Sequence, residues 1–301
     1  MGAATGPARR VRVEHVMGTT VSIDVRAPLV SDDAIEAAIE WLHDVDRRFS
    51  PFRPDSEVSR VGAGTIAFEE ASPDVRAMFT LASDLRERTG GYFDPAGHRA
   101  DRRPDPTGVV KGWAVDEAVL ILRLAGARNL QVVAGGDLVA LGEPEPGRPW
   151  RIGIRHPGDA SSVACVLQVR DLAVATSGLY ERGGHIVDPH TGRVPDGLRS
   201  LTVIGPGLAL TDAFATAGFA MGERGIAWVA RQEGFGAVGI TTDDRVVTTP
   251  LADRLLADAP AVGLPTAEPL GGLPIDGEIP AGRFPGGELL GAAGPIPDPR
   301  A

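Results

Sequence analysis

The chain has 301 residues, enough to bury a hydrophobic core in one large domain or in two small ones. Hydrophobic residues make up 43% of the sequence, as in an ordinary soluble globular protein, and 40 acidic against 30 basic residues give a net charge of −10. This balance argues against a sequence-independent nucleic-acid binder, because such a protein needs a basic surface. An anionic small ligand remains possible, since a local group of backbone N–H donors can bind phosphate without net positive charge.

The single cysteine, Cys165, leaves no means of forming an intrachain disulfide or a zinc site built from cysteines. Its apolar neighbours favour a buried thiol over a nucleophile. The N-terminal segment carries Arg9 and Arg10 without an apolar stretch behind them, so it does not resemble a secretory signal. No run approaches the roughly 18 apolar residues needed to span a bilayer. We therefore predict a cytoplasmic protein that does not span a membrane.

The first half of the chain carries clear helix signals. Ser31 is a good N-cap ahead of an apolar stripe at helical spacing, and Pro73 suits the first position of a second helix. The predicted elements are an interrupted strand over 11–26 and helices over 31–48, from 72 onward, and over 111–125.

The second half mixes strand and helix patterns without regular βαβ spacing, which favours an α+β fold. From about residue 260, some four in ten residues are Gly or Pro, which predicts a disordered tail. The predicted parts are a flexible N-terminus over 1–10, a domain over 11–259 and the tail over 260–301. The predicted elements are strands over 130–133, 138–141, 150–155, 164–169 and 201–204, helices over 212–221 and 226–231, and a hairpin over 237–249.

Polar and turn-forming residues are concentrated in the stretch 176–192, which reads TSGLYERGGHIVDPHTG. It begins with a predicted Thr-Ser-Gly turn. His185 precedes two β-branched residues, so we place it at the start of a strand, where it could face a ligand. Asp188 and Pro189 then predict a tight turn. The alternative is a hairpin with one exposed histidine.

A second segment, 105–116, reads DPTGVVKGWAVD. A Gly-rich turn that opens into a helix presents free backbone N–H groups, which suit a phosphate, and Lys111 in the first turn would add a cation. The alternative is a capped helix with a surface lysine. The segment 134–142, AGGDLVALG, is sufficiently explained as a tight hairpin.

A third segment, 211–222, places Asp212 and Thr216 four residues apart on one helix face. A carboxylate and a hydroxyl there make a sparse oxygen site, which suits Mg²⁺ completed by a backbone carbonyl, waters and phosphate oxygens. In the alternative interpretation, Asp212 caps the helix and the Thr216 hydroxyl bonds to the preceding turn.

Eight segments in this order resemble the ApbE family of flavin transferases, over about residues 11–259. The segments are MGTTVSIDV (17–25), FSPFRPDSEVSRV (49–61), GGYFDP (90–95), D-x-x-G-x-x-K-G-x-A-V-D (105–116), AGGD (134–137), WRIGIRHP (150–157), TSG…HIVDPHTG (176–192) and TDAFATAGFAMG (211–222).

The resemblance implies a T-fold-like α+β fold, with mixed helices and antiparallel sheets around a central FAD cleft. It implies Mg²⁺-dependent cleavage of FAD, transfer of FMN to a Thr or Ser hydroxyl of an acceptor protein, and release of AMP. Family acceptors carry a motif similar to Asp-x-x-Ser/Thr-Gly-Ala-Ser/Thr. Asp212, Thr216 and the carbonyl of Gly108 match the Mg²⁺ ligands, and His185 matches the base that deprotonates the acceptor hydroxyl.

The resemblance also implies a set of FAD-contacting positions. The loop between 95 and 105 is shorter than in many members and lacks the longer Trp-Gly-Phe insertion that many of them carry. Phe52 would supply a stacking face, or it is a core aromatic. The positions are Met17, Phe52, Tyr92, Phe93, Asp94, Asp105, Lys111, Thr176, Ser177 and Ile186.

Two other functions fit the same residues. A Mg²⁺-dependent FAD pyrophosphatase would use water in place of the acceptor hydroxyl and give FMN and AMP. A non-catalytic FAD-binding protein would hold FAD without releasing AMP, although it would have no use for a base aimed at the phosphate.

Overall fold

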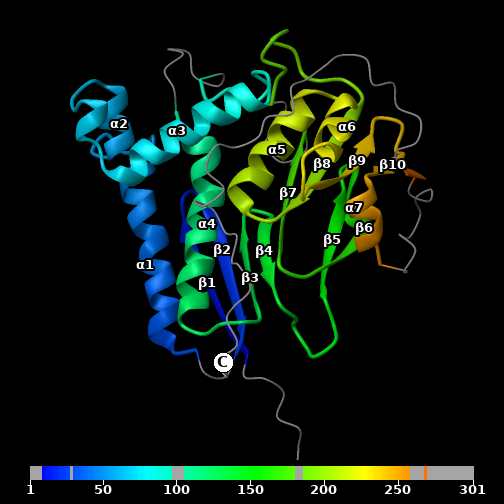
Figure 1. Cartoon of the computed structure of the whole chain (residues 1–301), viewed down its shortest axis with the longest axis horizontal. Coiled ribbons are helices and arrows are strands. Elements are labelled where there is room, and N and C mark those ends of the chain that lie inside the picture. The colour runs from blue at the N-terminus through cyan, green and yellow to red at the C-terminus, as the bar shows by residue number, and fades with distance from the viewer. Residues whose placement is uncertain (1–8, 28–29, 97–104, 180–185, 258–267, 270–301) are drawn as a thin grey trace, which may run out of the picture.

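The computed structural model describes residues 9–27, 30–96, 105–179, 186–257 and 268–269 (Figure 1). Its main feature is a nine-stranded sheet, in which every neighbouring pair is antiparallel except the last. In sheet order the strands are β1 (Arg9–Val16), β2 (Thr19–Arg26), β3 (Leu130–Ala134), β4 (Asp137–Leu141), β7 (Leu172–Gly178), β8 (Leu198–Gly205), β9 (Gly236–Thr241), β10 (Val246–Thr248) and β11 (Glu268–Pro269). A separate antiparallel pair consists of β5 (Trp150–His156) and β6 (Asp159–Val169).

Apart from α7, the helices lie on one face of the sheet, where α1 lies beside α4 and α5 lies over β7 and β8 (Figure 1). They share one hydrophobic core with the inward-facing residues of the sheet. The helices are α1 (Asp32–Phe49), α2 (Glu57–Gly62), the 3₁₀ helix η1 (Phe68–Glu70), α3 (Pro73–Arg88), α4 (Thr107–Leu124), α5 (Leu208–Ala220), α6 (Arg224–Ala230) and α7 (Pro250–Leu255).

The other face carries a second core, built where the β5–β6 pair and α7 pack against the sheet. Successive residues of a strand point to opposite faces, so β4 contributes to both cores. Val139 belongs to the helix side, and Leu138 and Ala140 belong to the other. By the same alternation, Asp137 faces the helices.

The α+β prediction is confirmed, as are the helices predicted over 31–48 and from 72. The helix predicted over 212–221 is present as α5, but it begins four residues earlier, at Leu208. Ser31 caps α1, since its side chain accepts a hydrogen bond of 3.3 Å from the backbone N–H of Ala34. The interruption at 17–19 is a tight turn in which Met17 (φ 54°) and Gly18 (φ 68°) both have positive φ.

Three local predictions are wrong. Thr176, Ser177 and Gly178 lie in β7 and form no turn, because β7 is a buried central strand that we did not assign. The helix predicted from 111 begins at Thr107, so Lys111 lies in its second turn. Ile186 and Val187 are in no strand, although the predicted turn after them is present, with the N–H of Gly192 bonded to the carbonyl of Asp188 at 2.8 Å.

Four predicted features lie wholly or largely outside the described residues. They are His185, residues 1–8 of the N-terminus, most of the shortened 96–104 loop and nearly all of the Pro/Gly-rich tail. Within the described part of the chain, no helix has the length and apolar character that crossing a membrane requires. The cytoplasmic location stays a prediction.

Candidate functional site

Two helices meet at very short range beside the predicted site. A Cβ atom on Gly112 of α4 would lie 2.6 Å from the Cα of Ala209 in α5, so only glycine permits this approach. One turn further along α4, the carboxylate of Asp116 accepts hydrogen bonds from the backbone N–H groups of Leu208 (2.8 Å) and Ala209 (2.9 Å). These N–H groups have no partner within their own helix, so Asp116 caps α5 from outside and fixes where it begins.

Burial raises the pKa of Asp116 to about 6, although the two N–H donors act in the opposite direction by stabilising the carboxylate.

Lys111, Asp137 and Asp212 form one charged cluster, contributed by α4, β4 and α5. The Nζ of Lys111 donates to Oδ2 of Asp137 and lies 3.2 Å from Oδ2 of Asp212. Oδ1 of Asp137 accepts a 2.9 Å hydrogen bond from the backbone N–H of Thr176 in β7. The cluster therefore connects two helices to two central strands.

The side chains of this cluster are largely withdrawn from water, with 7% of Asp137, 14% of Asp212 and 31% of Lys111 exposed. Burial alone would lower the pKa of Lys111, but the charges of Asp212 and Asp137 outweigh it and raise that pKa above its ordinary value. Burial and the charge of Asp212 raise the pKa of Asp137. The ammonium thus stays charged because two carboxylates surround it.

Asp212 and Thr216 interrupt an otherwise buried helix. From 208 to 220, every residue of α5 is buried except Leu210, Asp212 and Thr216. The Thr216 hydroxyl lies 3.4 Å from the hydroxyl of Ser177 on β7. The carboxylate and hydroxyl therefore share an accessible helix face, as their spacing predicts.

These donors fit Mg²⁺. Mg²⁺ prefers oxygen ligands and usually keeps several waters, so the protein needs to supply only a few of its ligands. One carboxylate, one hydroxyl and one backbone carbonyl form such a set. Asp212 already attracts a cation, the Lys111 ammonium. Gly108 is exposed in the first turn of α4, one turn before Gly112, on the side of the helix that approaches α5. Among the described residues, no cluster of three or more His, Cys, Asp or Glu side chains could hold a metal by itself.

The predicted flavin residues after α3 support the start of α4. Phe93 is buried, and a Cβ on Gly108 would lie 3.0 Å from its ring. Asp105 is buried and accepts a 2.9 Å hydrogen bond from the N–H of Thr107, the first residue of α4. Asp94 accepts from the N–H of Ala96 at 3.1 Å.

Tyr92 lies in a second polar group, together with His190 and Arg224. Its ring packs edge-on against His190, with centroids 4.6 Å apart, and its hydroxyl accepts a 3.0 Å hydrogen bond from Arg224. Nε2 of His190 lies 3.0 Å from the carbonyl of Gly90. This contact holds the turn after Asp188 against the loop that carries Tyr92.

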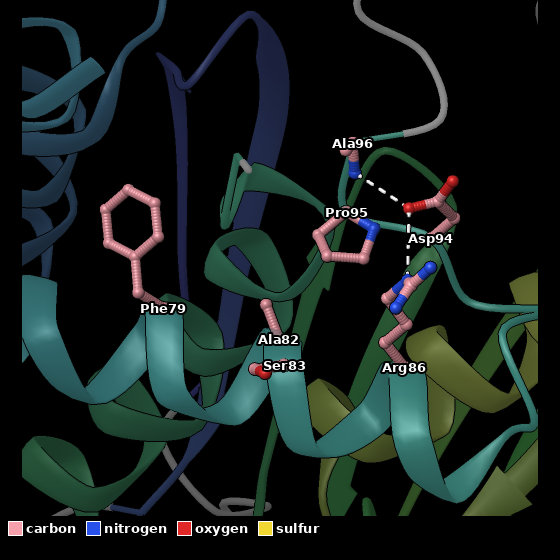
Figure 2. Close-up of a pocket in the computed structure, with 7 residues that line it drawn as sticks. All are labelled: Phe79, Ala82, Ser83, Arg86, Asp94, Pro95 and Ala96. Carbon is pink, nitrogen blue, oxygen red and sulfur yellow. Dashed lines mark hydrogen bonds and ion pairs between the residues drawn. The ribbon is translucent and has the colours of Figure 1, made fainter. Parts of the chain in front are cut away.

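A pocket of about 340 Å³ lies between α3 and the segment that follows it (Figure 2). Arg86 of α3 points toward Asp94, and their closest charged atoms are 3.6 Å apart. The pocket is lined by Phe79, Ala82, Ser83, Arg86, Asp94, Pro95 and Ala96.

The structure does not bring every predicted residue to the charged cluster. Phe52 is 93% exposed, so the core-aromatic alternative is wrong. Met17 and Ile186 are partly buried against the helix-side core. The hydroxyl of Thr176 pairs with that of Thr202 on β8 at 2.8 Å, and only its backbone reaches Asp137.

Sequence reasoning missed Asp137 and Asp116. Both end segments that carry the family resemblance, AGGD (134–137) and 105–116, but a tight hairpin was enough to explain the first, and Asp116 was given no role in the second. One signal was available: Lys111 is the only lysine among 30 basic residues. A chain that otherwise uses arginine for every positive side chain has a lysine only where it forms this cluster.

Comparison with known proteins assigns the family. The ApbE family profile matches residues 17–102 and 98–238, well over half of the chain. The chain belongs to the ApbE family.

ApbE relatives include a protein from Rhodobacter capsulatus named FAD:protein FMN transferase, which is 38% identical over 92% of this chain. This chain spans 64% of the length of that relative. A Vibrio cholerae protein of the same name is 29% identical and covers 73% of this chain and 84% of its own length.

Solved ApbE structures share the fold. The flavin transferase ApbE from Vibrio cholerae matches with a TM-score of 0.72 and 25% identity, over 83% of this chain and 99% of that one. The ApbE protein of Thermotoga maritima matches with a TM-score of 0.72 and 22% identity, over 83% of this chain and all of that one.

Proposed function

We propose that this chain is a FAD:protein FMN transferase that moves FMN from FAD to a Ser or Thr hydroxyl of an acceptor protein in a Mg²⁺-dependent reaction and releases AMP. The observation that carries the proposal is the pair Asp212 and Thr216, the partly exposed polar positions of a helix that is otherwise almost entirely buried, with Asp212 beside the ammonium of Lys111. The names of the ApbE relatives support the same activity.

In this proposal Asp212, Thr216 and the carbonyl of Gly108 hold the Mg²⁺ ion. The ion would polarise the reacting phosphoryl group and neutralise charge on the AMP leaving group. Lys111 places a second positive charge beside Asp212. Asp116 and Gly112 keep α4 and α5 in register, so the ligands from the two helices stay aligned.

The transfer exchanges one phosphorus–oxygen bond for another. The acceptor hydroxyl oxygen bonds to the phosphorus of the FMN half, and the bond from that phosphorus to the bridging oxygen breaks. AMP leaves with the bridging oxygen, and the hydroxyl proton passes to His185, a base whose ordinary pKa lies near neutrality. His185 lies outside the described residues, so its role rests on the ApbE resemblance.

FAD is proposed to contact the positions inferred from the resemblance. Of these, Phe93 and Asp105 also shape the start of α4. The acceptor is proposed to carry a motif similar to Asp-x-x-Ser/Thr-Gly-Ala-Ser/Thr.

The test is to incubate the purified chain with FAD and MgCl₂, with and without an acceptor domain, and to measure AMP and the mass of the acceptor. An acceptor heavier by one FMN, with an equal amount of AMP, supports the transferase. AMP with no modified acceptor supports the pyrophosphatase instead. FAD binding without AMP release would leave only a flavin-binding protein.

Variants assign the roles. His185→Ala is expected to lose transfer and keep FAD binding, and Asp212→Ala to weaken Mg²⁺-dependent cleavage. Asp159→Ala, at the start of β6 in the opposite layer, is the matched control and should react as the parent chain does. Normal transfer by His185→Ala would show that another group takes the proton.

A further inference from the structure

Lys111 lies between two carboxylates that differ in how firmly they are held. Asp137 accepts one hydrogen bond from the ammonium and a second, of 2.9 Å, from the backbone N–H of Thr176. Asp212 lies farther away, with its Oδ2 3.2 Å from Nζ, and is twice as exposed, at 14% against 7%. Asp137 is therefore the anchored partner of the lysine and Asp212 the replaceable one.

The charges of the cluster do not balance. One ammonium faces two carboxylates, which leaves a net charge of −1 in a site with little water. Such a site attracts a cation and repels a phosphate group. Addition of a divalent cation would bring the net charge to +1, which attracts phosphate.

A lysine suits an exchange of partners better than an arginine does. The ammonium is a compact charge on a flexible stem, whereas the planar guanidinium of arginine would hold both carboxylates in a fixed fork. Arginine accounts for the other 29 basic residues of the chain, so the one lysine marks a place where this difference matters.

We propose that the ammonium of Lys111 pairs with the carboxylate of Asp212 until a divalent cation replaces it there. Asp137 is then the positioning residue that keeps the displaced ammonium in the site. The inference rests on the proposed binding of Mg²⁺ at Asp212. It further implies an order of events, in which FAD phosphates bind well only after the cation has reversed the charge of the cluster.

The single lysine makes the exchange directly observable. In the full chain labelled with ¹³C,¹⁵N-lysine, Lys111 gives the only lysine side-chain signals. Addition of MgCl₂ without FAD is expected to shift them, because the ammonium loses one of its two carboxylates. Arg148→Lys, at an exposed position, adds a reference signal that should not move.

Calorimetric Mg²⁺ affinities of variants test the direction of the effect. Lys111→Met removes the competing cation, so affinity should rise by roughly tenfold or more. Lys111→Arg keeps a cation that holds both carboxylates, so affinity should fall. Asp137→Asn should also weaken Mg²⁺ binding, since the ammonium then has only Asp212 as a carboxylate partner. Lys111→Arg conserves the charge and keeps the test usable if Lys111→Met does not fold.

The outcomes separate the two proposals. If the parent chain binds no Mg²⁺, the proposed metal site and the exchange both fail. If the parent chain binds Mg²⁺ and Asp212→Asn weakens this binding, the metal site stands. A lysine signal that then stays fixed, or an unchanged affinity in Lys111→Met, would overturn the exchange alone.

Discussion

Both faces of the central sheet are buried, but the residues that cover them differ in polarity. The face toward β5–β6 and α7 is covered by a core of apolar residues, with Cys165 as a small thiol among them. The face toward α4 and α5 has a larger apolar core and also encloses Lys111, Asp137 and Asp212. Withdrawing charges from water is unfavourable unless each is paired, and apolar residues would often stabilise a fold at least as well. The comparison indicates that one face serves mainly stability, while the other keeps a polar cluster for chemistry.

The largest expected effect comes from breaking the charged cluster. Asp137→Ala should lower the free energy of unfolding by about 3–5 kcal/mol, because the ammonium loses its anchored partner and the N–H of Thr176 loses its acceptor. The measurement is urea unfolding of the parent chain and the variant. In the double variant with Lys111→Met, the loss should be smaller than the sum of the two single losses. Additive losses would show that Lys111 and Asp137 are not energetically coupled.

On the opposite face, a purely apolar change should affect stability alone. Leu167 on β6 is fully buried, and Leu167→Ala should cost about 2–4 kcal/mol through lost contacts and a cavity. Its Mg²⁺ affinity and AMP release should equal those of the parent chain at a temperature where both remain folded. A change in Mg²⁺ affinity would mean that the two faces are coupled through the sheet, against the division drawn above.

The contact between α4 and α5 is predicted to be less costly to disturb but more selective in its effect. Gly112→Ala adds a methyl group where the backbone of Ala209 leaves no room, so the helices must separate at a cost of about 1–3 kcal/mol. Because Gly108 and Asp212 lie on these two helices, Mg²⁺ affinity should fall as well. Gly126→Ala is the control variant, because it also replaces a glycine by alanine but away from the contact between α4 and α5. Its φ of 94° strains the backbone, but nothing lies within 4 Å of the added Cβ, so it should reduce stability without weakening Mg²⁺ binding.

Much of this architecture could be predicted from local pattern. The boundaries of α1 follow from its cap and apolar stripe, and they were predicted to within one residue. The interruption of the strand predicted over 11–26 is the turn at Met17-Gly18, and the hairpin predicted over 237–249 is the β9–β10 pair. Each of these features is encoded by residues close together in the chain.

The errors arise where distant contacts decide the structure. β7 is central and buried on both faces, so it lacks the alternation of a half-exposed strand and was not recognised. Asp137 and Asp116 have hydrogen-bond partners 26 to 93 residues away, and the residues next to them in the sequence do not indicate those partners. The pair Asp212 and Thr216 was predicted to share one helix face because its members lie four apart, and α5 places them so. The lysine between Asp137 and Asp212 could have been noticed from composition alone.

The last expected effect, no larger than that of Gly112→Ala, concerns Asp116 and pH. Burial raises the pKa of this carboxyl to about 6, while an aspartate in the unfolded chain titrates near 3.9. Between these values the folded chain holds a proton that the unfolded chain has released, so the free energy of unfolding falls as pH rises through this window. Asp116→Asn cannot titrate. The stability of the parent chain relative to this variant should therefore fall by about 1–3 kcal/mol between pH 4 and pH 7.

Groups common to both chains, including Asp137, cancel in the difference between parent and variant. Urea unfolding of the two chains at several pH values measures that difference. A difference that rose with pH would mean that the N–H groups of Leu208 and Ala209 outweigh burial and lower the pKa of Asp116. The Asp116 carboxylate would then stabilise the start of α5 at neutral pH. The helix-covered face of the sheet would contain this favourable charge in addition to the Lys111 cluster.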